Sequence, residues 1–345
     1  MRRRALLLAL LAGCGSKPQQ DQPTGSGSAP AVVTPRGTAD AWFSPPVIVD
    51  APPPPPPDAP PPPTRAQLGT VVAPASAIAL ALDGKQLYAL SAIDAILVSI
   101  DVATGAVTQL DKDAEKRGLP GGLVAGADGV WWDEQKVDDC TLVHADPAKK
   151  VAPATVTVIY GGAGPLAMDG KQLYIAGKRG LDRLDKKTAN IVNVATNKAG
   201  VAALASDADN LYWLEQNAAG DTAVMTAKKA GGEPVTIVKS ADVGKAARSL
   251  VLDGTTLYWS RGVDIVAMPK AGGKISPVVT SVAIGELLVV GAKLYWVEND
   301  EAIATAPKAG GQPQILGFAD HAAGLVSDGK TLYWGTPFDV RKLPL

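Results

Sequence analysis

Residues able to carry out chemistry are few and scattered in this sequence. It holds only two histidines, His144 and His321, so a metal site would need both to meet across the fold. The acidic pairs at 111–113 and 138–139 lack the spaced oxygen ligands and the glycine of a calcium loop. No nucleophile-elbow or dinucleotide fingerprint occurs in the right context. We therefore expect no catalytic residue, metal or cofactor, and a binding role is favoured over an enzymatic one.

The first thirteen residues have the pattern of an export signal. Arg2–Arg4 form a positive segment, and Ala5–Ala12 is an apolar run of 8 residues. A membrane-spanning helix needs roughly 20, so the run is typical of a signal peptide. Its end, Leu11-Ala12-Gly13-Cys14, resembles the lipobox of bacterial lipoproteins. That resemblance implies cleavage after residue 13 and a lipid on Cys14, which becomes the first residue of the mature chain.

Lipid on Cys14 has two consequences. Several acyl chains anchor a protein stably to a membrane. Residue 15 is Gly rather than the Asp that favours inner-membrane retention in some bacteria, so we expect the outer membrane. Cys140 then has no partner within the chain. It is either a reactive thiol or, as we prefer, a buried and inert residue on a strand.

Residues 14–66 have the composition of a disordered linker. They are rich in Pro, Gly and Ser, with proline blocks at 52–57 and 60–63. Proline lacks the backbone donor and fixes φ, so this segment should extend as polyproline II at about 3.1 Å per residue. The chain's formal net charge is -1. Nucleic-acid binding therefore has no electrostatic support.

The remaining residues, 67–345, repeat. Aromatic anchors begin at seven positions spaced 43, 43, 38, 46, 37 and 38 residues apart: Tyr88, Trp131, Tyr174, Tyr212, Tyr258, Tyr295 and Tyr333. In most repeats a Trp follows the Tyr. Adjacent side chains on a strand point to opposite faces. Both rings can be buried only if the sheet is covered on both sides, so we interpret the anchors as core rather than as a ligand cage.

Each anchor strand is preceded and followed by a hairpin signal. The preceding turns contain Asp-Gly at 83–84, 128–129, 169–170, 253–254 and 328–329, Asp-Asn at 209–210 and Val-Gly at 290–291. Asp-Gly is typical of a type I′ turn, with positive φ at both central residues. Turn chemistry explains these aspartates better than a ring of ligands would. Lys-Ala-Gly-Gly marks the second hairpin at 229–232, 270–273 and 308–311.

Four strands in about 40 residues match one blade of a β-propeller. We therefore predict an all-β, seven-bladed β-propeller of four-stranded antiparallel blades. The seventh repeat ends after three strands, near Leu343–Leu345, and an extra strand at 68–73 precedes the first repeat. The N-terminal strand should complete the last blade and close the ring.

The anchors of residues 67–345 resemble the YWTD motif of receptor-type propellers. The Thr-Asp half is missing, since Tyr212-Trp213 is followed by Leu214-Glu215 and Tyr258-Trp259 by Ser260-Arg261. The familiar YWTD domain also has six blades rather than seven. The resemblance therefore implies the fold and no binding residue.

Binding residues should lie on loops of one face, because the blades repeat while these loops vary. The candidates are Asp113, Lys116, Arg117, Lys178, Arg179, Asp242, Arg248, Arg261 and His321. The function we expect is a membrane-anchored, exported binding or scaffolding propeller whose ligand is a protein, a small molecule or a glycan. Two alternatives are an exported enzyme with its site at the central channel and a subunit of an outer-membrane assembly.

Overall fold

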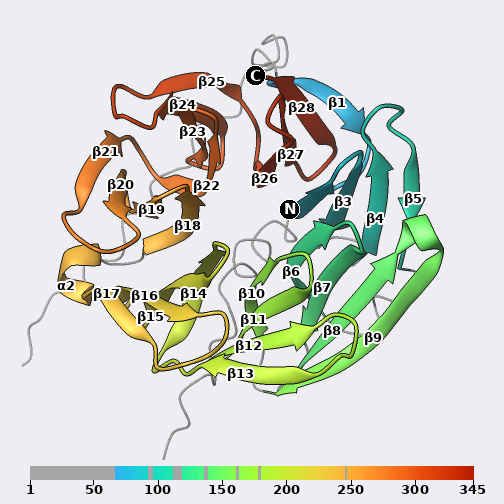
Figure 1. Cartoon of the computed structure of the whole chain (residues 1–345). Helices are drawn as coiled ribbons and strands as arrows, with labels where there is room; N and C mark the ends of the chain where they lie inside the picture. The colour runs from blue at the N-terminus through green and yellow to red at the C-terminus, as the bar shows by residue number, and fades with distance from the viewer. Residues whose placement is uncertain are drawn as a thin grey trace, which may run out of the picture. The chain divides into compact units, whose positions relative to one another are not determined.

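Seven four-stranded antiparallel sheets form the blades of a β-propeller (Figure 1). The structure, a computed structural model, describes residues 67–91, 96–111, 119–135, 139–160, 163–177, 180–244 and 247–345. The predicted signal peptide, Cys14 and the linker lie outside these residues.

Blades 1 to 3 come first in the chain. Blade 1 contains β2 (Ala79–Asp83), β3 (Gln86–Ser91), β4 (Ile96–Asp101) and β5 (Val107–Gln109). Blade 2 contains β6 (Leu119–Gly126), β7 (Gly129–Gln135), β8 (Asp139–Asp146) and β9 (Val151–Tyr160), with the short 3-10 helix η2 (Pro147–Lys149) before β9. Blade 3 contains β10 (Ala163–Met168), β11 (Gln172–Gly177), β12 (Gly180–Asp185) and β13 (Ile191–Ala195).

Blades 4 to 6 follow the same order. Blade 4 contains β14 (Gly200–Ser206), β15 (Asn210–Gln216), β16 (Thr222–Lys228) and β17 (Val235–Val238), followed by the helix α2 (Ser240–Val243). Blade 5 contains β18 (Ala247–Asp253), β19 (Thr256–Arg261), β20 (Asp264–Pro269) and β21 (Ser276–Thr280). Blade 6 contains β22 (Ile284–Val290), β23 (Lys293–Glu298), β24 (Ala302–Pro307) and β25 (Gln314–Phe318).

Blade 7 joins the two ends of the domain and confirms the predicted closure. Its strands are β26 (Ala323–Ser327), β27 (Thr331–Gly335), β28 (Val340–Pro344) and the N-terminal β1 (Thr70–Ala73). β1 pairs antiparallel with β28, with Thr70 opposite Lys342, and Figure 1 shows the blue β1 beside the dark red β28. The seam extends to blade 6, because the Leu68 amide donates to the Phe318 carbonyl at 2.6 Å.

The aromatic anchors fill the spaces between blades, as predicted. The Tyr of one blade and the Trp of the next share a buried cluster: Tyr174 with Trp213, Tyr212 with Trp259, Tyr258 with Trp296, Tyr295 with Trp334, and Tyr88 with Trp132. These ten rings are 0 to 6% exposed. Each blade therefore buries its second strand against both neighbours, which accounts for the adjacent aromatic residues.

The turns before the anchors differ from the predicted type I′ geometry. Asp83 is the last residue of β2, and Gly84 and Lys85 form the two-residue loop. Only Gly84 has positive φ, at 57°, which is the pattern of a type II′ turn. In blade 4 the equivalent aspartate is Asp207 rather than Asp209, because the Asp207 amide donates to the Asn210 carbonyl at 3.0 Å. The aspartate side chain is thus free to accept hydrogen bonds beside the loop.

Candidate functional site

The ring has two faces with different connections. We call the turn face the side that carries the hairpin turns within each blade, such as 84–85 and 229–232. The loop face is the opposite side, which carries the connections after each second strand and between blades, such as 217–221 and 281–283.

Four of the nine predicted binding residues are described. Arg261, at the end of β19, donates from Nη1 to the carbonyl of Asp242 on α2 at 3.3 Å. Arg248 lies exposed on the neighbouring β18, where it pairs with Ser260. These residues meet where the chain crosses from blade 4 to blade 5. The other five predicted residues, and Cys14, lie outside the described residues: Asp113, Lys116, Arg117, Lys178 and Arg179.

His321 lies apart from this group, between blades 6 and 7. It has a φ of 52°, and its Nδ1 lies 2.6 Å from Oδ1 of Asp320. The Asp320 amide donates to the Gln67 side chain at 3.2 Å. The exposed imidazole therefore lies near Gln67, the first residue that the structure describes.

Two polar groups of the inner strands hold neighbouring blades together. Ser249 Oγ accepts from the Leu287 amide at 2.8 Å, and Glu286 Oε2 accepts from the Leu325 amide at 2.7 Å. Burial raises the pKa of Glu286, against the lowering effect of the Leu325 and Gly324 amides. Both side chains therefore act as inter-blade acceptors beside the central axis.

A buried acidic cluster lies in blade 2. Asp133 accepts hydrogen bonds from the Gly122 amide and from the Cys140 thiol, whose Sγ lies 3.6 Å from Oδ2. Burial raises the pKa of Asp133 to about 6, although both hydrogen bonds lower it. Cys140 is buried, and it forms no disulfide with another described residue.

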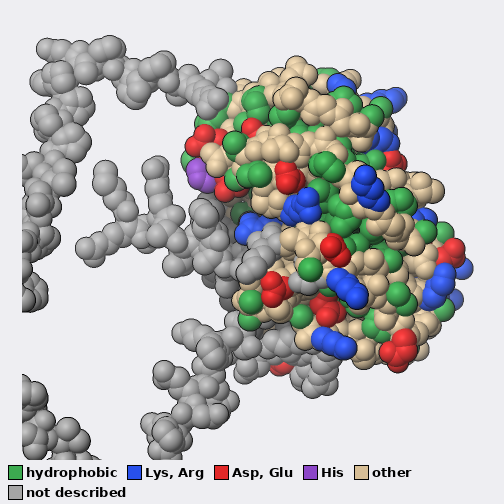
Figure 2. All heavy atoms as spheres, turned by 90° about the vertical axis from the view of Figure 1, so that its left-hand side faces the viewer, with side chains coloured by type: hydrophobic (Ala, Val, Ile, Leu, Met, Phe, Trp, Pro, Cys, Tyr) green, Lys and Arg blue, Asp and Glu red, His purple; other side chains and the backbone are tan. Residues whose placement is uncertain are grey.

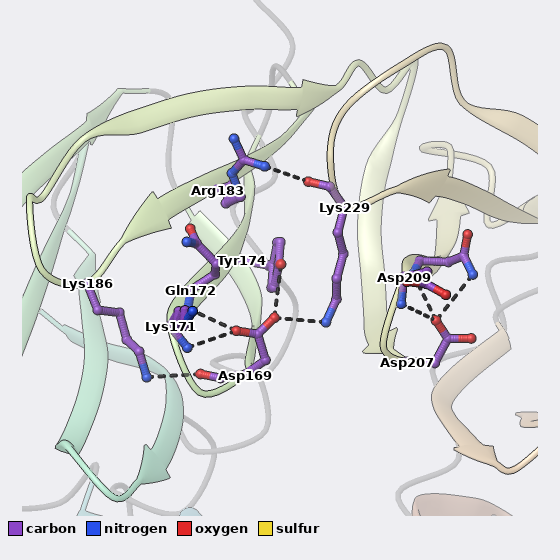
Figure 3. Close-up of polar contacts among 10 residues, drawn as sticks. Asp169, Lys171, Gln172, Tyr174, Arg183, Lys186, Asp207, Asp209 and Lys229 are labelled. Carbon is purple, nitrogen blue, oxygen red and sulfur yellow. Dashed lines mark hydrogen bonds and ion pairs between the residues drawn. The ribbon is translucent and has the colours of Figure 1, made fainter.

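The turn face carries a repeated ion pair that joins successive blades. Asp169, at the first turn of blade 3, accepts from Lys229 Nζ of blade 4 at 2.9 Å (Figure 3). Its Oδ1 also accepts from the Lys171 and Gln172 amides at 3.0 Å, and its Oδ2 from the Tyr174 hydroxyl at 3.0 Å. Lys229 Nζ lies 4.9 Å from the centroid of the Tyr174 ring, so the ammonium also contacts the π face.

The same lysine position forms the same contact at three other interfaces. Lys186 reaches Asp128 at 2.9 Å, Lys270 reaches Asp207 at 2.5 Å, and Lys308 reaches Asp253. We call these four contacts the blade clasps. They join blades 2 to 6, and three of the four lysines begin the Lys-Ala-Gly-Gly turns. Their aspartates are therefore structural acceptors.

Burial and hydrogen bonding act in opposite directions on these groups. Burial alone would raise the pKa of Asp169, but Lys229, the two amides and the Tyr174 hydroxyl lower it to about 2. Burial, together with the Asp169 carboxylate, raises the pKa of Tyr174. Burial and Asp207 likewise raise the pKa of Tyr212 to about 12. The carboxylates stay ionised and the phenols neutral across the physiological range.

One blade clasp opens into a groove. Between blades 3 and 4 a hollow of about 500 Å³ is lined by Asp169, Gln172, Tyr174, Arg183, Ala208, Asp209, Lys228, Lys229, Ala230 and Gly231. Three of these side chains are cationic and two are anionic, which leaves a local excess of one positive charge. We call this hollow the blade 3/4 groove.

Arg183 distinguishes this interface from four of the others. It lies opposite Tyr174 on the neighbouring strand, where blades 1, 4, 5 and 6 place small residues opposite their Tyr: Ser99, Thr226, Ala267 and Thr305. Blade 7 places Lys342 opposite Tyr333, and blade 2 places His144 opposite Trp131. Among the described residues, Arg183 makes one side-chain hydrogen bond, from Nη1 to the Lys229 carbonyl at 2.9 Å (Figure 3). Its other donors point to no described protein acceptor.

Two more groups of the blade 3/4 groove lack protein partners. Lys228 is exposed and forms no side-chain hydrogen bond or ion pair among the described residues, whereas blades 5 and 6 place Pro269 and Pro307 at the same position. Gln172 donates to Asp185 at 3.4 Å, but its buried Oε1 finds no donor in the described chain. The blade 3/4 groove thus combines unused donors with an unused acceptor.

Sequence reasoning missed the blade 3/4 groove because it placed the candidate binding residues on the loop face and interpreted the turn aspartates as structural. Aligning the repeats by their Tyr would have shown an Arg where four other blades hold Ser, Thr or Ala. The described residues contain no group of three or more side chains that could hold a metal. None of the helices in the described part is long and apolar enough to cross a membrane.

Comparison with known proteins identifies the fold and no family. No protein-family model and no curated protein matches the chain. Among solved structures, hydrazine synthase of Kuenenia stuttgartiensis is similar with a TM-score of 0.62 and 14% identity, over 81% of this chain and 98% of that chain.

Two further structures are similar over most of the domain. PorZ of Porphyromonas gingivalis matches with a TM-score of 0.56 and 14% identity, over 80% of this chain and 38% of its own. BamB of Moraxella catarrhalis matches with a TM-score of 0.52 and 15% identity, over 79% of this chain and 85% of its own. At these identities the likeness establishes the β-propeller fold alone.

Proposed function

We propose that this chain is an exported, lipid-anchored β-propeller that binds a ligand or partner at the bacterial cell envelope, on the outer membrane. The fold supports a binding role because the aromatic clusters and blade clasps make a rigid ring. The blade 3/4 groove carries the proposal, because its side chains depart from most of the other repeats and keep unused hydrogen-bonding groups around one hollow. Rigid scaffolds with a few convergent polar groups are typical of ligand sites.

The location rests on the leader. Arg2–Arg4, the short apolar run and Leu11–Cys14 support export and lipidation, and the proline-rich segment supports a spacer between membrane and propeller. PorZ, whose fold is similar, is itself a bacterial surface component of the type-IX secretion system. A propeller can therefore serve at such a surface.

The anchor is tested with the full-length chain and a Cys14→Ser variant expressed in a diderm bacterium. The wild-type chain should incorporate radiolabelled palmitate and sediment with outer membranes, and Cys14→Ser should incorporate none and appear in the soluble fraction. Cys140→Ser is the matched control and should behave as wild type. If Cys14→Ser remains in the membrane pellet after a carbonate wash, lipidation is not the tether.

The binding role is tested by crosslinking in intact cells, followed by purification from detergent-solubilised membranes. We expect a defined partner or ligand to co-purify with the wild-type chain. An Arg183→Thr variant should lose it, whereas Lys293→Thr, the same charge change at an exposed strand position of blade 6, should keep it. Equal recovery with both variants would place binding away from the blade 3/4 groove and contradict its role.

A further inference from the structure

The blade 3/4 groove has a charge and donor arrangement that selects among ligands. Its cations are Arg183, Lys228 and Lys229, and its anions are Asp169 and Asp209. Lys229 and Asp169 neutralise each other at 2.9 Å. The remaining Arg183 and Lys228 exceed Asp209 by one positive charge. An incoming anion therefore meets two cations that no described side chain neutralises directly.

Resting on the proposed binding function, we infer that the blade 3/4 groove binds a ligand through a single carboxylate group, which Arg183 and Lys228 hold. A guanidinium presents a planar fork of donors that matches the two oxygens of a carboxylate. Nε and Nη2 of Arg183 have no described acceptor, so this fork is available. Lys228 supplies a second charge from the facing blade.

The two carboxylates of the blade 3/4 groove explain why a carboxylate is favoured over phosphate. A phosphate monoester carries about -1.5 to -2 charges at neutral pH. It would exceed the local positive charge and lie beside Asp169 and Asp209. A carboxylate carries one charge and leaves the groove close to neutral.

Gln172 gives the ligand a second requirement. Its Oε1 is buried at the wall of the blade 3/4 groove without a donor from the described chain. A buried acceptor left unpaired costs about 1–3 kcal/mol. A ligand with an N–H or O–H group near its carboxylate removes that penalty. Acidic peptides and uronic-acid sugars both have this arrangement, and the test distinguishes these two sources.

On the side of the molecule that Figure 2 shows, acidic and basic side chains are interspersed without a large patch of one sign. This side therefore offers an anion no long-range attraction. Recognition therefore depends on contacts within the blade 3/4 groove. Binding should weaken with salt only modestly, because few charges take part.

The test measures binding of three probes to the full chain by calorimetry and by the ¹⁵N resonance of Arg183 Nε. The probes are N-acetylglutamate methylamide, methyl glucuronide and inorganic phosphate. We expect a carboxylate probe to shift the Arg183 Nε resonance and to bind more tightly than phosphate. Whichever carboxylate probe binds more tightly identifies the ligand as acidic peptide or as uronic-acid sugar.

The binding variants are chosen so that the protein should still fold. Arg183→Thr copies blades 4 and 6, and Lys228→Met keeps the aliphatic stem. Each should weaken carboxylate binding by at least about tenfold, because a charged hydrogen bond is lost. Asp209→Asn should strengthen it about threefold by removing a like charge. Lys293→Thr is the control and should bind as wild type.

Three outcomes would overturn the inference. They are no shift of the Arg183 resonance with either carboxylate probe, tighter binding of phosphate, or unchanged binding by a folded Arg183→Thr variant. A partner recovered by crosslinking in cells, without carboxylate binding in these assays, would overturn this inference and leave the proposed binding function standing. If neither a crosslinked partner nor carboxylate binding is found, this inference and the proposed binding function are both overturned.

Discussion

At the scale of single residues, the blade clasp of Asp169 combines several modest interactions on one carboxylate. Asp169 accepts from two turn amides, the Tyr174 hydroxyl and Lys229, all at 2.9 to 3.0 Å. The Lys229 side chain is 11% exposed and Asp169 is 34% exposed. The pair therefore lies between a surface ion pair, which contributes about 0–1 kcal/mol, and a buried one, whose disruption costs about 3–5 kcal/mol.

Replacing the lysine should destabilise the ring measurably. Lys229→Met keeps the aliphatic stem but leaves Asp169 without its cation, and we expect a loss of about 1–3 kcal/mol in the free energy of unfolding at pH 7. Urea titration followed by tryptophan fluorescence measures it, with Lys293→Met as the control. In a double-mutant cycle with Asp169→Asn, the two losses should not add, and additive losses would contradict direct coupling.

This contribution has a defined pH dependence. The pKa of Asp169 is about 2 in the folded chain and about 3.9 when unfolded. The folded state therefore binds fewer protons in this interval, and the stabilisation is complete above the unfolded pKa. It is lost as pH falls through the folded pKa, so the difference between wild type and Lys229→Met should shrink in acid.

Asp133 should produce the opposite pH dependence. Burial raises its folded pKa to about 6, so the folded state binds more protons than the unfolded state between about pH 4 and 6. Stability from this group should increase by about 1–2 kcal/mol as pH falls from 7 to 5. Asp133→Asn should remove that increase in urea titrations at both pH values, and the exposed Asp242→Asn should retain it. An identical pH slope in wild type and Asp133→Asn would exclude Asp133 as its source.

At the scale of elements, the repeat made the blades predictable. Strands, anchors and ring closure follow from aromatic spacing and from the fact that Tyr and Trp on adjacent positions must both be covered. The turn type could not be predicted from Asp-Gly alone, because the strand register decides which two residues form the loop. In blade 1 the register puts Asp83 in the strand and Gly84 at the first loop position.

The blade 3/4 groove was less accessible to sequence reasoning for a physical reason. Arg183 lies on an ordinary strand, and its significance depends on the Tyr174 that faces it and on Lys228 from the next blade. Such contacts join residues of different blades, and their geometry depends on how the sheets pack. The predicted loop-face residues were chosen because loops vary between repeats, and the strands were interpreted only as the repeated core.

The four blade clasps join blades 2 to 6 and leave blade 1 without one, which suggests a stabilising substitution there. Val102 occupies the clasp-lysine position of blade 1, since its amide donates to the Lys85 carbonyl as the Lys270 amide donates to that of Thr255. The facing Asp328 of blade 7 already accepts from two turn amides and from Tyr333. Val102→Lys should therefore form a fifth clasp and raise the free energy of unfolding by about 1 kcal/mol, after the loss of partly buried valine packing.

Chemical denaturation measures this gain, and the reason for it is tested separately. In an Asp328→Asn background the Val102→Lys substitution should no longer stabilise the chain. A gain of the same size in that background would show that the new lysine acts through something other than Asp328.

At the scale of the whole molecule, the ring is closed by non-covalent contacts of the N-terminal strand. The Arg341 guanidinium supports this seam by donating to the Leu68 carbonyl at 3.3 Å and the Gly69 carbonyl at 3.4 Å. Every described hydrophobic cluster with an anchor Tyr is shared by two blades. Opening the seam therefore exposes the flanks of blade 7 and weakens its neighbours.

Gly69 is the most sensitive point of this closure. It has a φ of 73°, and a Cβ added there would lie 2.5 Å from the Lys342 carbonyl oxygen and 2.6 Å from the Trp334 ring. Gly69→Ala must therefore displace β1 from β28 or shift a fully buried Trp, and we expect a loss of about 2–4 kcal/mol in the free energy of unfolding. Gly170→Ala is the matched control, because nothing lies within 4 Å of its added Cβ. In urea titrations the control should stay within about 0.5 kcal/mol of wild type, while Gly69→Ala unfolds at lower urea. Equal stability of the two variants would mean that the β1–β28 seam does not limit the stability of the ring.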